Sequence, residues 1–327
     1  MRSLSALILT MALAVAGAHA GDDPKSKNKK DDPSQIGNRD TGKCLNFYSV
    51  DKEIAMGKQL AEEVVRQVKT NDDPLLGEFV NRVGQNLVRN SDAKVPFTFR
   101  VIEDDAPNAF ALPGGFIFVN TGLIKIASEE DEFAGAVAHE IAHVAARHLT
   151  CRATKGQLAN ILSLPLGMVL GGWTGYAVRQ GAGAGMQTVF AGFSRADETE
   201  ADYLGVQYMY ATGYDPNGAV SIFEKLEALQ HTKPGLVAKV LATHPMDAQR
   251  IDRTQQEIQR ILPARPEYVV STSEYHDMRE RLIASQNRRK GDDSDSHPHL
   301  RVAPGTGKAD DPGSDDRPTI RRRELME

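Results

Sequence analysis

Three residues within one short stretch have the types and spacing for metal-dependent hydrolysis. The segment AVAHEIAHVAARH (136–148) places His139 and His143 four positions apart, with Glu140 directly after the first histidine. Residues four apart share a face of a helix, so both imidazoles can bind one zinc ion. Glu140 projects roughly 100° away from His139 and can take a proton from water at the metal. The alternative interpretation is two histidines that only fill a core.

A third protein ligand is expected in the acidic segment SRADETEAD (194–202). Its Glu198 and Asp202 are again four positions apart on a predicted helix. We expect Glu198 to bind the metal and Asp202 to orient one of the histidines. Glu200 lies on a different face and is a weaker candidate, and His148, about 140° around the first helix from the second histidine, is excluded as a ligand. The alternative here is a solvated acidic helix start, which the helix dipole favours.

Four separated motifs extend this pattern along the chain. They are NAFALPGGFIFVNTGLI (108–124), AHEIAHVAARH (138–148), SRADETEAD (194–202) and THPMDAQRI (243–251). In sequence and order they resemble the M48 family of zinc metalloendopeptidases, over approximately residues 45–260. The resemblance implies a zincin-like metallopeptidase fold, of the gluzincin type, with one zinc ion per chain. It implies that zinc is bound by His139, His143 and Glu198, with Glu140 as general base and Asp202 as a supporting carboxylate.

The resemblance also implies roles for residues that spacing alone does not single out. His244 matches a family histidine that supports the oxyanion or, in some members, occupies the open zinc position and keeps the enzyme inactive. Arg250 matches a family arginine with a supporting role. The strand GFIFVN (115–120) matches the family's edge strand, to which an extended substrate adds by main-chain pairing. Substrate contacts are therefore expected from Asn108, Phe116, Phe118 and Asn120.

The elements that must position these residues are mostly helices. Apolar residues recur at helical spacing within 50–70 (Ile54, Leu60, Val64, Val68) and within 73–90 (Leu75, Phe79, Val83, Leu87). The helix that carries the histidines opens with Ser128 and Asp131 in capping-box positions. Further helices are predicted in ADETEADYLGVQYMYATG, DPNGAVSIFEKLEAL, HPMDAQRIDRTQQEIQRI and SEYHDMRERLIAS.

Two short segments predict strands. PFTFRVIE (96–103) and GFIFVN (115–120) are rich in β-branched and aromatic residues, and Pro113-Gly114-Gly115 favours a turn just before the second of them. The fold class is therefore mainly α with a small β-sheet (α+β). A net charge of -5 gives no reason to expect a nucleic acid partner.

The two ends of the chain differ in composition from the centre. Residues 1–20 have a basic start, an apolar run and an Ala-His-Ala ending, the pattern of a cleavable signal peptide, and predict export to a bacterial periplasm. A retained membrane anchor is the alternative. Residues 21–44 and 286–327 are polar and rich in charge, glycine and proline, and predict a disordered linker and tail. The folded domain is expected over 45–285.

Two features remain open at this point. The uncharged segment 161–178 contains a proline and several glycines, so we expect a buried or site-covering hairpin that touches a membrane surface rather than a bilayer span. Cys44 and Cys151 either pair or stay free. A disulfide would contribute roughly 4 kcal/mol on the chain-entropy model.

The expected function is a zinc-dependent endopeptidase that cleaves misfolded or unassembled envelope proteins. A largely latent zinc protein that acts as a chaperone-like assembly factor is the alternative, and a different zinc hydrolase on the same scaffold is a third possibility. The occupant of the fourth zinc position distinguishes the first two: water indicates a protease, and a nitrogen of His244 indicates latency.

Overall fold

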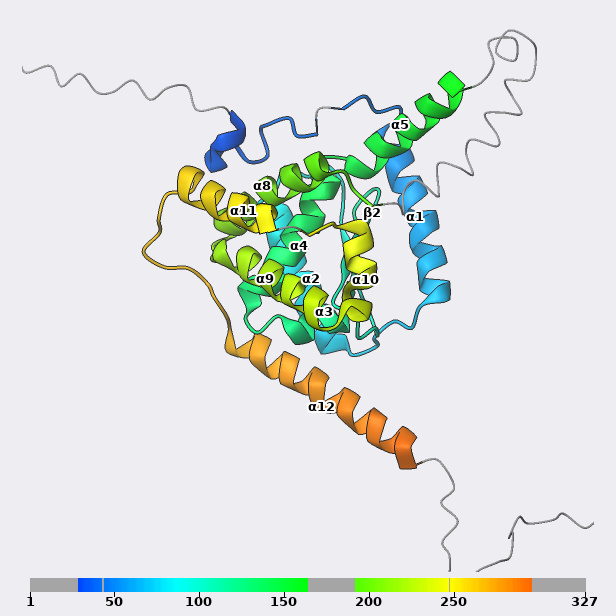
Figure 1. Ribbon diagram of the computed structural model, residues 1–327, viewed down its shortest axis with the longest axis vertical. Coiled ribbons are helices and arrows are strands. Elements are labelled where there is room, and N and C mark those ends of the chain that lie inside the picture. Colours follow the sequence, from blue (N-terminus) through cyan, green and yellow to red (C-terminus); the bar gives the residue numbers. More distant parts are fainter. Residues whose placement is uncertain (1–28, 43, 164–191, 247, 296–327) are drawn as a thin grey trace, which may run out of the picture. The chain divides into compact units, whose positions relative to one another are not determined.

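The computed structural model describes residues 29–42, 44–163, 192–246 and 248–295, and Figure 1 traces the chain. It divides into two units, residues 1–283 and 284–327. The site and the elements that build it belong to the first unit. The predicted signal peptide and most of the apolar segment 161–178 lie outside the described residues.

A small sheet confirms both predicted strands but corrects their arrangement. Its order is β1-β3-β2, with β1 (Thr98–Ile102) parallel to β3 (Phe116–Asn120) and β2 (Ala109–Leu112) antiparallel to it. The strand predicted as an edge is therefore the central one. The expectation that β3 receives a substrate strand is wrong, because neighbouring strands already pair with both of its sides.

The edge strand next to β3 is β2, which the sequence patterns do not predict. A hairpin connects the two strands through the expected turn, where Gly114 and Gly115 have φ of 74° and 93°. The amide of Asn120 donates to the carbonyl of Asn108 (2.9 Å), so ladder alternation directs the backbone N–H and C=O groups of Ala109 and Ala111 away from β3. Among the described residues no strand pairs with that outer edge of β2.

Two amphipathic helices precede the sheet, as predicted. Ser49 caps α1 (Val50–Gln67), and Asp73 caps α2 (Pro74–Arg89), whose first residue is the proline that favours a helix start. The buried stripe of α2 contains Phe79, Val83 and Leu87, but Leu75 is 54% exposed and Leu76 is buried in its place. The buried stripe therefore begins at Leu76 and not at the predicted Leu75.

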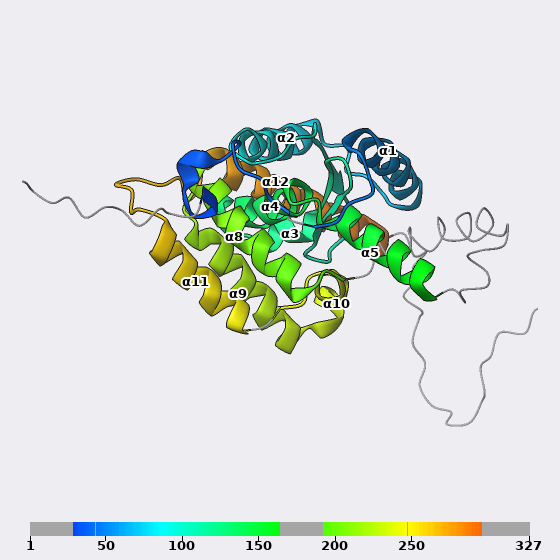
Figure 2. The same cartoon turned by 90° about the horizontal axis from the view of Figure 1, so that it is seen from above.

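Helix α4 (Glu130–Ala145) carries the predicted metal ligands and is buried along nearly its whole length. It packs against β2, α2, α8 (Arg195–Thr212) and α9 (Asn217–Thr232); Figure 2 shows it between α2 and the α8–α9 pair. Small residues allow this close packing. A Cβ on Gly135 would lie 2.8 Å from the Cα of Ala219, and one on Gly205 would lie 3.3 Å from the amide nitrogen of His139.

Both ends of α4 differ from the prediction. The N-terminal capping box pairs Glu129 with Glu132 rather than Ser128 with Asp131, and the Glu132 carboxylate accepts from the Ser128 amide (2.6 Å). At the other end the helix stops at Ala145, and Arg147 adopts a left-handed conformation with φ of 57°. A separate helix, α5 (His148–Ser163), begins directly afterwards. The helical angle used to exclude His148 does not apply across this break.

The remaining helices bring distant segments to α4. Helix α3 (Thr121–Ile126) follows the sheet, α10 (Pro234–Thr243) ends next to His244, and α11 (Ala248–Ile261) carries Arg250. Helix α12 (Ser273–Asp295) starts in the first unit, where Tyr275 is fully buried. The mainly helical class with a small sheet is confirmed. None of the described helices is long and apolar enough to cross a membrane.

The segment before α1 is ordered over most of its described length. It contains two short 3-10 helices, η1 (Lys29–Asp31) and η2 (Pro33–Gln35). Arg39 is buried, with Nε donating to Asp92 (2.8 Å) and Nη1 to Gln207 (2.6 Å). The prediction of a disordered linker is therefore wrong for residues 30–42, because a buried ion pair fixes this polar segment to the domain.

Two further predictions concern the chain's covalent and terminal features. Cys44 and Cys151 form a disulfide, with 5.9 Å between their Cα atoms, which settles a pairing that the sequence left open. Helix α12 continues to Asp295, past the domain boundary that the sequence predicts at residue 285. Residues 296–327 lie outside the described residues.

Candidate metal centre

The two histidines of α4 meet through the same ring atom. Nε2 of His139 and Nε2 of His143 are 3.0 Å apart, and both side chains are buried. The four-residue spacing brings the rings side by side, as predicted from the helical period. Two ring nitrogens that both present a lone pair do not stabilise each other at this distance. They are well placed to bind one cation together.

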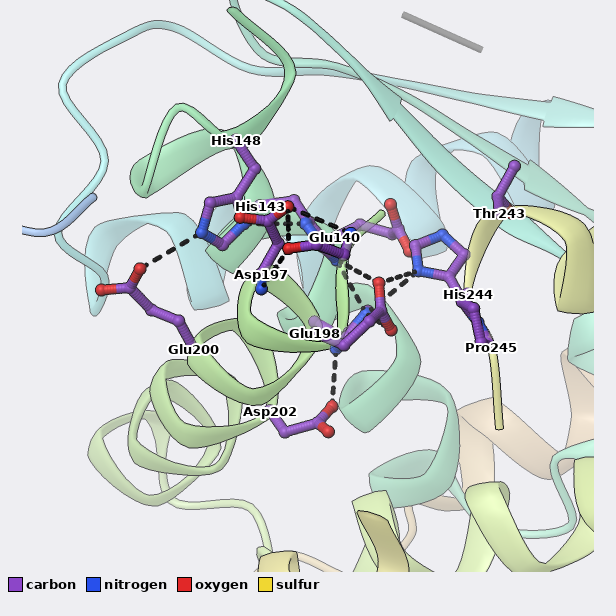
Figure 3. Close-up of polar contacts among 12 residues, drawn as sticks. Glu140, His143, His148, Asp197, Glu198, Glu200, Asp202, Thr243, His244 and Pro245 are labelled. Atoms are coloured by element: carbon purple, nitrogen blue, oxygen red, sulfur yellow. Dashed lines mark hydrogen bonds and ion pairs between the residues drawn. The ribbon is translucent and has the colours of Figure 1, made fainter. Parts of the chain in front are cut away.

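Glu198 reaches the two histidines from the first turn of α8. A capping box between Ser194 and Asp197 sets the start of that helix. Glu198 Oε1 is 3.3 Å from Nε2 of His143, and Oε2 is 3.5 Å from Nε2 of His139. Figure 3 shows the carboxylate directed at the imidazoles. Burial raises the pKa of Glu198, but the imidazoles of His244 and His139 outweigh this and lower it, which keeps the ligand ionised.

His244 completes the cluster from the loop after α10. Its Nδ1 lies 3.2 Å from Nε2 of His139 and 3.1 Å from Oε1 of Glu198. Candidate ligand atoms of His139, His143, Glu198 and His244 all lie within 4.8 Å of one another. The resemblance left two roles open for His244, and its Nδ1 lies close enough to the other donors to serve as a fourth ligand.

The spacing of these donors fits zinc. Tetrahedral zinc with bonds of about 2.0–2.1 Å requires neighbouring ligand atoms about 3.3 Å apart. Four of the separations in this cluster are 3.0, 3.1, 3.2 and 3.3 Å, and all the candidate donor atoms lie within 4.8 Å of one another. Imidazole nitrogens with one carboxylate are also ligands that zinc prefers. Both the donor types and their distances therefore suit a zinc ion held by His139, His143 and Glu198, with His244 in reach.

Glu140 lies beside the donors but is not one of them. Its Oε1 is 3.4 Å from Nε2 of His244, and its buried Oε2 has no hydrogen-bond partner among the described residues. Burial raises the pKa of Glu140. A pocket opens here, lined by Pro107, Ala109, Leu123, Ala136, His139, Glu140, Phe223, Leu226, Val240, His244, Met246 and Arg250. Glu140 is thus a basic group at the wall of a mostly apolar cavity.

Asp202 and Arg250 lie directly behind the candidate ligands and contact them. Asp202 Oδ1 lies 2.9 Å from Nδ1 of His139, the ring nitrogen that faces away from the cluster. Arg250 makes a two-pronged contact with Asp202, through Nε (2.6 Å) and Nη2 (2.7 Å), and its Nη1 is 2.6 Å from Oε2 of Glu198. Burial raises the pKa of Asp202, but the positive charge of Arg250 outweighs the effect of burial, so the pKa is lowered. Burial lowers the pKa of His139, yet Glu198 and Asp202 raise it to about 9.

The substrate residues expected on the sheet are placed differently. Phe118 is buried and stacks on Phe110 with ring centroids 5.2 Å apart, and the Asn120 side chain donates to the carbonyl of Ala106. Neither these nor Phe116 line the pocket. Asn108 is buried with Oδ1 lacking a hydrogen-bond partner among the described residues, and its neighbours Pro107 and Ala109 form the pocket wall. A role for Asn108 in substrate binding stays a prediction.

Sequence reasoning missed two contacts of His143. The Phe193 ring stacks on its imidazole at a centroid distance of 3.8 Å, and the Phe193 amide donates to the carbonyl of Thr243 (2.9 Å), next to His244. On its other side, Nδ1 of His143 lies 2.9 Å from Nδ1 of His148. The sequence shows His148 five positions after His143. Its contact with His143 could not be predicted, because a continuous helix would direct His148 away and the break after α4 is not visible in the sequence.

Comparisons with known proteins show the family of the chain. The family model for peptidase family M48 matches residues 74–258, more than half of the chain. The beta-barrel assembly-enhancing protease of Escherichia coli K12 is 29% identical over 248 residues, which cover 73% of this chain and 50% of that protein. The Yersinia pestis protein of the same name is 31% identical over 225 residues, covering 66% and 46%.

A mitochondrial relative matches over a comparable length. The mitochondrial metalloendopeptidase OMA1 of Schizosaccharomyces pombe is 30% identical over 221 residues, covering 65% of this chain and 63% of that protein. This chain spans about half the length of the bacterial relatives. With the match of residues 74–258 and the buried His-His-Glu cluster inside that range, the chain belongs to peptidase family M48.

Proposed function

We propose that this protein is a zinc-dependent endopeptidase that cleaves unfolded or misassembled proteins of the cell envelope. The observation that carries the proposal is the set of donor atoms of His139, His143 and Glu198, whose separations fit one zinc ion next to a buried, pocket-facing Glu140. Membership of peptidase family M48 supports the reaction class.

The reaction needs a base close to the metal position. When bound, zinc would polarise the scissile carbonyl and make water a stronger nucleophile at neutral pH. Glu140 accepts the proton of the attacking water and then delivers it to the leaving amine. Two features suit it to both steps: its Oε2 has no hydrogen-bond partner among the described residues, and burial raises its pKa.

The outer edge of β2 is the proposed binding surface for the substrate backbone. Ala109 and Ala111 direct their N–H and C=O groups to this edge, and Ala109 lines the pocket that contains Glu140. An extended peptide can add there by main-chain hydrogen bonds. The neighbouring wall includes Leu123, Phe223 and Leu226, which suits an apolar side chain. Unfolded proteins present both an extended backbone and exposed apolar side chains.

An envelope location is supported by two observations. The Cys44–Cys151 disulfide is typical of oxidising compartments such as the periplasm. The bacterial relatives are named for enhancing β-barrel assembly, so we propose that proteins destined for the envelope are the substrates and that the activity is one of quality control. The predicted signal peptide agrees with this location.

The position of His244 favours a second candidate function. Its Nδ1 takes the place of a fourth ligand, which would keep water from that position. A protein held in this state would act as a latent, chaperone-like assembly factor and cleave rarely.

The test is cleavage of an intrinsically unfolded protein, β-casein, by the purified mature chain, with the zinc content measured in the same sample. We expect one zinc per chain, cleavage at internal peptide bonds, loss of activity with 1,10-phenanthroline and recovery on adding zinc. A wild-type chain that binds zinc but leaves casein intact, and that cleaves casein once His244 is replaced by alanine, would support the latent factor instead.

A further inference from the structure

We infer that His148, with Glu200 and Lys30 behind it, is a positioning residue that fixes the orientation and tautomer of His143 as a metal ligand. The inference rests on the proposed zinc site. His139 is oriented by direct contact between its Nδ1 and a carboxylate, Asp202, at 2.9 Å. The matching nitrogen of His143 meets a third histidine instead, with 2.9 Å between Nδ1 of His143 and Nδ1 of His148.

The contact determines where the hydrogens lie. To bind a cation, Nε2 of His143 must offer its lone pair, and a neutral imidazole then carries its hydrogen on Nδ1. Nδ1 of His143 therefore donates, and Nδ1 of His148 must accept with its own lone pair. The hydrogen of a neutral His148 is consequently on Nε2, on the far side of its ring.

The next contacts in the chain agree with that assignment. Nε2 of His148 lies 3.3 Å from Oε2 of Glu200, a contact that Figure 3 marks with a dashed line. An ionised carboxylate can only accept a hydrogen bond, so Nε2 of His148 is the donor. The other oxygen of Glu200 accepts from Nζ of Lys30 at 2.7 Å. Each link has one donor and one acceptor, so a single arrangement of hydrogens satisfies the whole series from Lys30 to the metal-facing nitrogen of His143.

The backbone is shaped to bring His148 into this place. A helix continuing past Ala145 would turn His148 about 140° away from His143. Instead, Arg147 takes a left-handed conformation with φ of 57°, which is uncommon for a residue other than glycine. Glu53 holds its guanidinium, with both carboxylate oxygens 3.0 Å from Nε. The break after α4, which the Arg147–Glu53 salt bridge stabilises, thus places His148 next to Nδ1 of His143.

Lys30 gives the segment before α1 a part in the site. Glu200 is 26% exposed and would be drawn toward solvent without a cation at this side. Lys30 belongs to the segment before α1, which the Arg39 contacts and the disulfide of Cys44 attach to the domain. Positioning of His143 therefore extends from α4 through α8 to residues at the start of the described chain.

The experiment measures zinc affinity by competition with a chromophoric chelator, for the full mature chain and the variants His148→Leu, His148→Asn and Glu200→Gln. Loss of a group that orients a ligand typically costs about 10–100-fold in metal affinity. We expect a loss of that size for His148→Leu and a smaller one for Glu200→Gln. We expect His148→Asn to recover most of the affinity, because its Oδ1 can accept the same hydrogen bond. His276→Leu, at an exposed histidine, is the matched control.

A measurement on the unaltered protein keeps the test independent of folding. Long-range ¹H–¹⁵N NMR of the zinc-loaded wild type should find hydrogen on Nδ1 of His143 and Nε2 of His148, and none on Nδ1 of His148. Hydrogen on Nδ1 of His148, or zinc affinity in His148→Leu within twofold of a tightly binding wild type, would overturn the inference and leave the proposed function standing. A wild type that binds no zinc would overturn both.

Discussion

Nδ1 of His244 lies 3.1 Å from Oε1 of Glu198, close enough for both atoms to bind the same metal ion. The two residues come from segments 46 positions apart, and each is buried. If both atoms bind zinc, the site has four protein ligands instead of the three of an open hydrolase site. Removal of the His244 imidazole should therefore change the rate of proteolysis.

His244→Ala should increase proteolysis, because water then takes the position that the imidazole held. If the closed form accounts for nine-tenths of the molecules, kcat/KM for β-casein rises about tenfold. His231→Ala, at an exposed histidine on α9, should change nothing. A fall in kcat with zinc still bound would mean that His244 supports the transition state instead of closing the site.

Arg250→Met should destabilise the metal-free protein far more than the zinc-loaded one. Arg250 is the buried cation beside Glu198 and Asp202, and breaking such a contact leaves buried charge uncompensated, at a cost of about 3–5 kcal/mol. Zinc would neutralise part of that charge. Urea unfolding with and without zinc measures the difference. Arg281→Met breaks an exposed pair with Asp73 and should cost under about 1 kcal/mol. Equal losses at both positions would contradict this account.

Removing the disulfide should lower thermal stability without changing the metal site. The cysteines are 107 positions apart, and a loop of that length corresponds to about 4–5 kcal/mol on the chain-entropy model. For the double variant Cys44→Ala/Cys151→Ala we expect Tm to fall by about 10 °C. Dithiothreitol should lower the Tm of the wild type similarly and leave the double variant unaffected. An unchanged Tm would show that the bridge does not form in solution.

Asp131→Asn should stabilise the domain at pH 8 more than at pH 5. Burial, with nearby Asp215 and Glu132, raises the pKa of Asp131 from 3.8 to about 7. Between these values the folded state binds more protons than the unfolded state, so the stability contributed by this carboxyl falls as pH rises from about 4 to about 7. Asparagine does not titrate. The gap in urea midpoint between variant and wild type should therefore widen with pH.

The control for this pH dependence is a residue in the same helical position but in solvent. Asp51 is the second residue of α1, as Asp131 is of α4, and it is exposed. Asp51→Asn should give a gap in urea midpoint that is small at both pH values. If the Asp131→Asn gap is as flat as that of the control, the pKa of Asp131 is not raised by its surroundings.

The sequence was sufficient for the residues whose positions depend on a local period. His139, Glu140 and His143 follow from the helical repeat, and Glu198 with Asp202 from the same repeat on a second helix. Local capping and apolar spacing also predict α2 and α8. These features are encoded within a few turns of chain, so a pattern of ten to twenty residues is enough to predict them.

What the sequence could not show depends on contacts between distant segments. β2 is four residues long and becomes a strand only by pairing with β3, so nothing within it marks it as the sheet's edge. The polar stretch around Arg39 has the composition of a linker, yet it is held to the domain by Asp92, in the loop after α2, and by Gln207 of α8. The placement of His148 follows from the left-handed Arg147, which Glu53 holds from a segment 94 positions away.

The central claim is that Glu140 is the base of a zinc-dependent peptide hydrolysis, and one measurement tests it most directly. Glu140→Gln is assayed for β-casein cleavage and for bound zinc in the same preparation. Glu140 is not among the candidate metal ligands, so the variant should keep one zinc per chain. Without the base, cleavage should fall by about 10²–10⁴-fold. Cleavage at the wild-type rate by a zinc-loaded Glu140→Gln protein would contradict the account.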